Sequence, residues 1–169
     1  MFYRIGQFCN ALYPKIKTDE YVWLNSVLTP GELAIFYRQT LTEQRHALDV
    51  AMDIEEQKNE LVERFGDVSY HCLLHASLLH DCGKSLFRLR LWQRVAIVAV
   101  NYLPEKWKNH ISKRGILGKT MVIYQQHPAW GKRLASKAGL DKEIQTLIEN
   151  HHQPGSPMEK VLFQADNRH

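Results

Sequence analysis

The sequence predicts an all-α protein, and three observations support this fold class. Apolar side chains recur at three- and four-residue spacing along most of the chain, which is the period of an amphipathic helix. Few segments show the alternation of apolar and polar residues that is typical of strands. At three places a Ser or Thr stands three residues before a Glu, the spacing of a capping box that begins a helix: Thr29 with Glu32, Thr40 with Glu43, and Ser156 with Glu159.

These signals place the expected helices in order from residue 29 to the C-terminus. A glycine or proline closes five of them, because neither residue continues a helix well: Gly66, Gly83, Pro104, Gly139 and Pro154. We expect helices at 33–37, from Thr40 to Gly66, at 68–81, at 86–102, at 128–138, from Asp141 to His152, and at 160–166.

Length and composition favour one small intracellular domain. A chain of 169 residues with 44% hydrophobic content can bury a single core. We therefore expect one globular unit at 29–169, preceded by an N-terminal helical extension at 1–28. Three cysteines without paired spacing, and the lack of a cleavable leader or an apolar stretch of membrane-spanning length, predict a cytoplasmic protein without a membrane span.

The pair His80-Asp81, at the end of an apolar helix, is the most informative feature of the chain. It offers a neutral nitrogen and an anionic oxygen from adjacent residues, a combination that suits a divalent cation. Five further side chains of the same two types lie in or beside expected helices, and a compact bundle could turn all of them toward one interior point: His46, His127, His151, His152 and Asp166. The sequence therefore predicts a metal site.

The order of these residues resembles that of the HD superfamily of metal-dependent phosphohydrolases. The resemblance runs from about Gln44 to Asp166 and includes the residues around each ligand. It is carried by Arg45-His46-Ala47-Leu48-Asp49-Val50-Ala51, Leu78-Leu79-His80-Asp81-Cys82-Gly83-Lys84, His127-Pro128-Ala129-Trp130-Gly131 and Leu147-Ile148-Glu149-Asn150-His151-His152. It implies an all-α HD-domain helical bundle. The chain has Gln153-Pro154-Gly155 after its histidine doublet, so it lacks the signature of the HD-GYP subclass.

The ligand set predicts how one or two metal ions would be held. Asp81 is the natural bridge, because a carboxylate can divide its two oxygens between two ions. His46, His80 and Asp166 would complete one ion, with His127, His151 and, as an open alternative, His152 on the other. So many imidazoles favour Fe, Mn, Ni, Co or Zn over Mg. Thr42 stands where some family members have a glutamate for a third ion.

The function expected from the resemblance is hydrolysis of a nucleotide or related phosphoester or phosphoanhydride by a metal-activated hydroxide. Asp81 and Lys84 are the expected catalytic residues, since the family lysine at the position of Lys84 faces the substrate phosphate. Two alternatives stay open: a di-iron oxygenase built on the same ligands, and a non-catalytic regulatory protein that binds metal or nucleotide.

The basic segment from Lys84 to Lys119 has two interpretations. It holds nine Lys or Arg and one acid, Glu105, with aromatic residues interleaved. It is either a solvated helix face or a positive wall that attracts a small phosphorylated substrate, with a nucleotide the first candidate. No motif for sequence-specific nucleic-acid binding is present. His71, His75 and Cys82 are interpreted as structural residues.

Overall fold

The computed structural model describes residues 14–86 and 115–169, and within these ranges all regular structure is helical, with no strand. This confirms the predicted all-α class. The elements are α2 (Thr18–Val27), α3 (Pro30–Phe36), α4 (Leu41–Glu56), α5 (Lys58–Phe65), α6 (Asp67–Leu79), the 3₁₀ turn η1 (Cys82–Leu86), α9 (Gly115–Lys137), α10 (Lys142–Asn150) and α11 (Pro157–Arg168). None of the described helices is long and apolar enough to cross a membrane.

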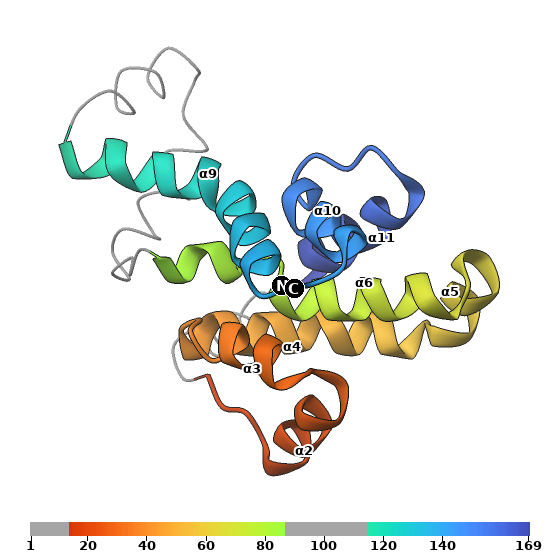
Figure 1. Ribbon diagram of the computed structural model, residues 1–169. Helices are drawn as coiled ribbons and strands as arrows, with labels where there is room; N and C mark the ends of the chain where they lie inside the picture. Colours follow the sequence, from red (N-terminus) through yellow and green to blue (C-terminus); the bar gives the residue numbers. More distant parts are fainter. Residues whose placement is uncertain (1–13, 87–114) are drawn as a thin grey trace, which may run out of the picture.

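The centre of the fold is the antiparallel pair α4 and α6, which α5 connects at one end (Figure 1). Helices α10 and α11 pack on α6, and α11 also contacts α4. Helix α9 packs against α10 and against η1, directly after the end of α6. The end of α6 is therefore the place where helices from distant parts of the sequence meet.

The core is a single apolar cluster that runs through these helices. Its largest fully buried side chains include Tyr70 and Leu73 from α6, Leu48 from α4 and Leu147 from α10. Leu24 of α2 is also fully buried in this cluster. Burying each such side chain contributes about 1.5–3 kcal/mol, so the helices that carry the polar site are held by a continuous core.

All three capping boxes form as predicted. The carboxylates of Glu32, Glu43 and Glu159 each accept from the backbone N–H of the N-cap residue, at 2.9, 2.8 and 2.7 Å. The N-cap hydroxyls accept the reciprocal bonds from the backbone of the same glutamates. A cap of this kind contributes about 1 kcal/mol, and the third begins the helix that carries Asp166.

Several helix boundaries differ from the prediction. The helix from Thr40 to Gly66 is divided at Gln57, whose backbone leaves the helical range at φ −94° and ψ 8°. Helix α6 ends at Leu79, and η1 follows it. The helix expected at 128–138 begins at Gly115 and holds Pro128 in its interior. The helix expected at 86–102 falls mainly outside the described residues.

Helix α2 is tied to α4 by an ion pair at the surface of the core. Arg45 of α4 donates to both carboxylate oxygens of Glu20 at 2.7 Å and to Asp49 one turn along its own helix. Together with buried Leu24 and Leu28, this pair anchors residues of the predicted N-terminal extension on the bundle. The division into an extension at 1–28 and a domain at 29–169 stays a prediction.

Candidate metal centre

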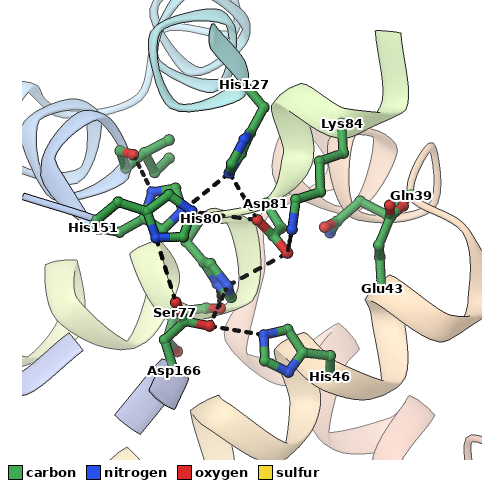
Figure 2. A network of polar contacts seen from close by, with 12 residues as sticks. Gln39, Glu43, His46, Ser77, His80, Asp81, Lys84, His127, His151 and Asp166 are labelled. Atoms are coloured by element: carbon green, nitrogen blue, oxygen red, sulfur yellow. Dashed lines mark hydrogen bonds and ion pairs between the residues drawn. The ribbon is translucent and has the colours of Figure 1, made fainter. Parts of the chain in front are cut away.

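The structure brings all seven predicted ligands together where α6 ends (Figure 2). These seven side chains come from five segments of the chain, all of which meet at this point. His46 lies on α4, His80 and Asp81 follow α6, His127 lies on α9, His151 and His152 follow α10, and Asp166 lies on α11.

One group of ligands forms around Asp166. His46 Nε2 lies 2.9 Å from Asp166 Oδ1, and His80 Nε2 lies 3.4 Å from the same oxygen. The potential ligand atoms of His46, His80 and Asp81 lie within 4.8 Å of one another. This geometry brings together the residues predicted to hold the first ion.

The second group consists of three imidazoles. His127 Nε2 lies 3.2 Å from His151 Nε2, and the rings of His151 and His152 are 4.0 Å apart. Helix α10 ends at Asn150, so the doublet lies beyond the regular helix. This end explains how neighbouring residues, which would point about 100° apart on a helix, both face His127. All three ligand atoms lie within 4.8 Å of one another.

Asp81 lies between the two groups. Its Oδ1 is 3.2 Å from His127 Nε2 and 3.8 Å from His151 Nε2, while its Oδ2 is 3.8 Å from His80 Nε2. Each carboxylate oxygen thus faces a different group. The side chain is 4% exposed, so its charge is held inside the protein.

Three of the histidines are oriented by the same backbone contact. His80, His127 and His151 each place Nδ1 within 2.6–2.8 Å of the carbonyl oxygen three residues earlier. An Nδ1–H that donates to a carbonyl fixes the tautomer and leaves the Nε2 lone pair available as a ligand. In each case Nε2 is the nitrogen that faces Asp81.

Helix ends and a proline make these carbonyls available. A helix leaves its last four carbonyls without an intrahelical partner, and His80 and His151 are the C-cap residues of α6 and α10. His127 lies inside α9, where Pro128 follows it. Proline has no N–H to donate to the carbonyl of Tyr124 four residues earlier, so this oxygen accepts from His127 instead.

Several polar atoms of the site have no hydrogen-bond partner among the described residues. They are His80 Nε2, Asp81 Oδ1 and His152 Nε2, all of them buried. A buried polar atom left unpaired costs about 1–3 kcal/mol. Nitrogen and oxygen lone pairs that converge on one point are what a divalent transition metal requires, so the donor set fits such an ion.

The electrostatics of the site also favour a bound positive charge. Burial disfavours the charged form of His80, but the carboxylates of Asp81 and Asp166 outweigh it and raise its pKa to about 9. Burial and the neighbouring His127 lower the pKa of His152 to about 4. Despite burial, Lys84 and His80 hold the pKa of Asp81 well below its usual range. Despite burial, His80 and His46 likewise hold the pKa of Asp166 below its usual range, so both aspartates are ionised at neutral pH.

Lys84 of η1 extends along one side of Asp81. Its Nζ lies 2.5 Å from Asp81 Oδ2, and its side chain is 25% exposed (Figure 2). Its pKa is raised despite burial, chiefly because of the Asp81 carboxylate. Lys84 is thus a cation that contacts the central carboxylate and also reaches the protein surface.

The residues interpreted as structural do not join the site. His75 pairs with Glu32 of the first capping box at 2.7 Å, while His71 is 53% exposed and lies 3.7 Å from Asp67. Both belong to the lining of a separate cavity of about 390 Å³ between α3, α6 and the α9–α10 turn. Cys82 is fully buried, and burial together with Asp81 raises its pKa to about 12.

Sequence reasoning missed two residues that assemble the site. Gly83 was predicted only to end a helix, yet a Cβ at this position would lie 1.9 Å from the His127 carbonyl oxygen. Pro128 was predicted to begin a helix, yet it lies within α9 and leaves the carbonyl that orients His127 without a helical donor. A His-Pro pair inside an apolar periodic segment is the sequence signal that could have revealed this second role.

Comparison with known proteins identifies the family. A family model that describes the HD domain matches residues 44–169. No curated protein and no solved structure matches the chain significantly. The matched region contains all seven converging side chains and most of the described fold. The chain belongs to the HD-domain family.

Proposed function

We propose that this protein is a metal-dependent phosphohydrolase that acts on a small phosphorylated substrate, in first place a nucleotide or a related phosphoester or phosphoanhydride. The observation that carries the proposal is the buried convergence of five histidines and two aspartates around Asp81. Membership in the HD family supports the reaction class.

Two groups of ligands are available for two ions. His46, His80 and Asp166 would hold one, and His127, His151 and His152 the other, with Asp81 shared between them. Imidazole nitrogens outnumber carboxylates in this set, which favours Fe, Mn, Co, Ni or Zn. Bound divalent ions of this type lower the pKa of water toward neutrality and offset the charge that develops on a phosphoryl group.

The protein's own residues would prepare the site for this chemistry. The backbone carbonyls behind His80, His127 and His151 hold the imidazoles with Nε2 inward, so little reorganisation is needed. Lys84 would receive the substrate phosphate, since its ammonium is a compact positive charge at a partly exposed position. Asp81 would align both halves of the site through its two oxygens.

The basic segment between Lys84 and Lys119 would attract the anionic substrate to this entrance. Most of this segment lies outside the described residues, so the positive wall stays a prediction from the sequence. A cytoplasmic location likewise stays a prediction.

The experiment that tests the function combines metal content with hydrolysis. We expect protein purified without oxygen to carry about two equivalents of a transition metal by elemental mass spectrometry, and Asp81→Ala to lose them. His71→Ala is the matched control, because His71 lies on α6 and does not join the site. A panel of nucleotides and phosphoesters would then be assayed with that metal.

Three results would argue against the proposal. Less than about a tenth of an equivalent, with no uptake of added Mn, Fe, Zn or Ni, would contradict a metal-dependent enzyme. Equal metal content in the parent and in Asp81→Ala would contradict the shared ligand. Consumption of dioxygen by an iron-loaded protein without release of phosphate would favour the oxygenase alternative.

A further inference from the structure

Gln39 is a buried glutamine with one unsatisfied atom next to the proposed site. It lies between α3 and α4 and is 3% exposed. Its Nε2 donates to the carbonyl of Leu78 at 3.2 Å, near the end of α6. Its Oε1 has no hydrogen-bond partner among the described residues. Because Nε2 is held by a carbonyl, the amide cannot flip without opposing two oxygens, so Oε1 points away from Leu78.

The amide of Gln39 points toward the ammonium of Lys84. In Figure 2 the Lys84 Nζ lies between Asp81 on one side and the Gln39 amide on the other. Glu43, four residues after Gln39 in the sequence, also contributes to the charge environment that raises the pKa of Lys84. The ammonium has three donors, of which the described contacts account for one, to Asp81 Oδ2.

A metal ion bound to Asp81 would change the preferred position of the Lys84 ammonium. Asp81 Oδ2, the oxygen that accepts from Lys84, also faces His80 Nε2 at 3.8 Å. An ion held by His80 and Asp81 would bind this carboxylate oxygen and would repel the positively charged ammonium beside it. Lysine has a long flexible stem, so its Nζ can leave Asp81 by side-chain rotation if another acceptor lies within reach.

We propose that Gln39 is a positioning residue for Lys84: its Oε1 accepts the Lys84 ammonium when Asp81 gives its oxygens to a metal ion. This inference rests on the proposed function, because it requires an ion at Asp81. The new hydrogen bond satisfies the buried Oε1 and keeps the positive charge of Lys84 at the edge of the site, where a substrate phosphate arrives. Gln39 thereby raises the affinity of the site for metal.

A purely structural role for Gln39 makes a different prediction. The bond from Nε2 to Leu78 caps the end of α6 directly before His80, and losing this cap would disturb the ligands whatever residue stands at position 84. The acceptor role, in contrast, requires the ammonium of Lys84. A double-mutant cycle between Gln39 and Lys84 therefore separates the two roles.

The test is Mn²⁺ binding to the full chain, freed of metal with a chelator and titrated by calorimetry. We expect Gln39→Met, which conserves side-chain volume, to weaken Mn²⁺ binding about tenfold through loss of a charge-assisted hydrogen bond. In the Lys84→Met background the same change should weaken binding by less than about twofold. Gln44→Met is the matched control, because Gln44 is buried nearby and its Nε2 donates to the backbone carbonyl of Gln39.

A second variant removes the cap and keeps the acceptor. Gln39→Glu loses the donor to Leu78 and retains an oxygen for Lys84, so we expect Mn²⁺ affinity at least equal to that of the parent. If Gln39→Glu weakens Mn²⁺ binding as much as Gln39→Met does, the inference is overturned. The same holds if the effect of Gln39→Met persists in the Lys84→Met background. In either case Gln39 acts only as a cap for α6. A parent protein that binds no Mn²⁺ or other transition metal would instead overturn the proposed function itself.

Discussion

Substituting Gly83 by alanine is the most direct way to separate α9 from the His80-Asp81 turn. A Cβ at Gly83 would lie 1.9 Å from the His127 carbonyl oxygen and 2.7 Å from the Gly131 nitrogen. Both atoms belong to the backbone of α9, so no side-chain rotation relieves the contact. Approaches under 3.0 Å are essentially never seen for real Cβ atoms, so α9 and η1 must move apart by more than 1 Å.

This displacement has consequences for stability and for metal binding. Overpacking of this kind costs about 1–3 kcal/mol of the free energy of unfolding. It also carries His127 away from Asp81, whose Oδ1 is only 3.2 Å from His127 Nε2. Sites that bind metal must hold their ligands within about 0.5 Å, so we expect metal affinity to fall at least tenfold, a loss comparable to that of a residue supporting a ligand.

The assay is urea unfolding of the metal-free protein, followed by Mn²⁺ titration of each variant. Gly31→Ala is the control, because a Cβ at Gly31 in α3 would meet nothing within 4 Å. We expect this control to keep the parent's metal affinity. Parent-like stability and metal affinity in Gly83→Ala would refute the argument, since they would mean that α9 tolerates the added methyl group without moving.

Three further predictions follow from the contacts of the site. Pro128→Ala restores an N–H that competes for the Tyr124 carbonyl, so we expect a more stable α9 in thermal unfolding but weaker Mn²⁺ binding through His127. Glu159→Gln replaces a carboxylate that accepts from the backbone N–H groups at 155 and 156 with a neutral amide. The free energy of unfolding in urea at neutral pH should therefore fall by about 1–2 kcal/mol, and an unchanged midpoint would contradict this. In the metal-free protein, the pKa of His80 is raised from its ordinary value of 6.5 to about 9. The protonated imidazole therefore contributes stability that is fully present below pH 6.5 and is lost as the pH rises through about 9. The decline in unfolding free energy between these pH values should therefore be smaller in His80→Asn than in the parent.

The three helix starts with capping boxes were predictable because they depend on local chemistry. Each capping box needs only a hydroxyl, a glutamate and the backbone between them, and all three formed as expected. The residues that converge were also predictable, because His and Asp in that order resemble a family with one fold. Confirmation of the family extends from residue 44 to the C-terminus, while the roles of the individual ligands stay proposals.

Helix boundaries and close approaches were not predictable in the same way. The role of Gly83 depends on the backbone atoms of His127 and Gly131 in α9, which lie more than 40 residues later in the chain. Pro128 favours a helix start by its local preference, but the structure places it after three turns of a helix that begins at Gly115. The contact that decides the role of Gly83 is tertiary, so sequence periodicity carries no information about it, whereas Pro128 acts on the Tyr124 carbonyl of its own helix.

The bond from a histidine Nδ1 to the carbonyl three residues earlier explains how this bundle holds several buried histidines. A buried imidazole needs a partner for Nδ1 if Nε2 is to remain available as a ligand, and a helix interior offers few unused carbonyls. In this chain, unused carbonyls are available because His80 and His151 lie at helix C-termini and His127 precedes a proline. Because each carbonyl lies three residues earlier on the same segment, each ring is oriented by its own segment and not by a neighbouring helix. Tertiary packing brings these segments together at Asp81, and Gly83 permits the close approach of α9.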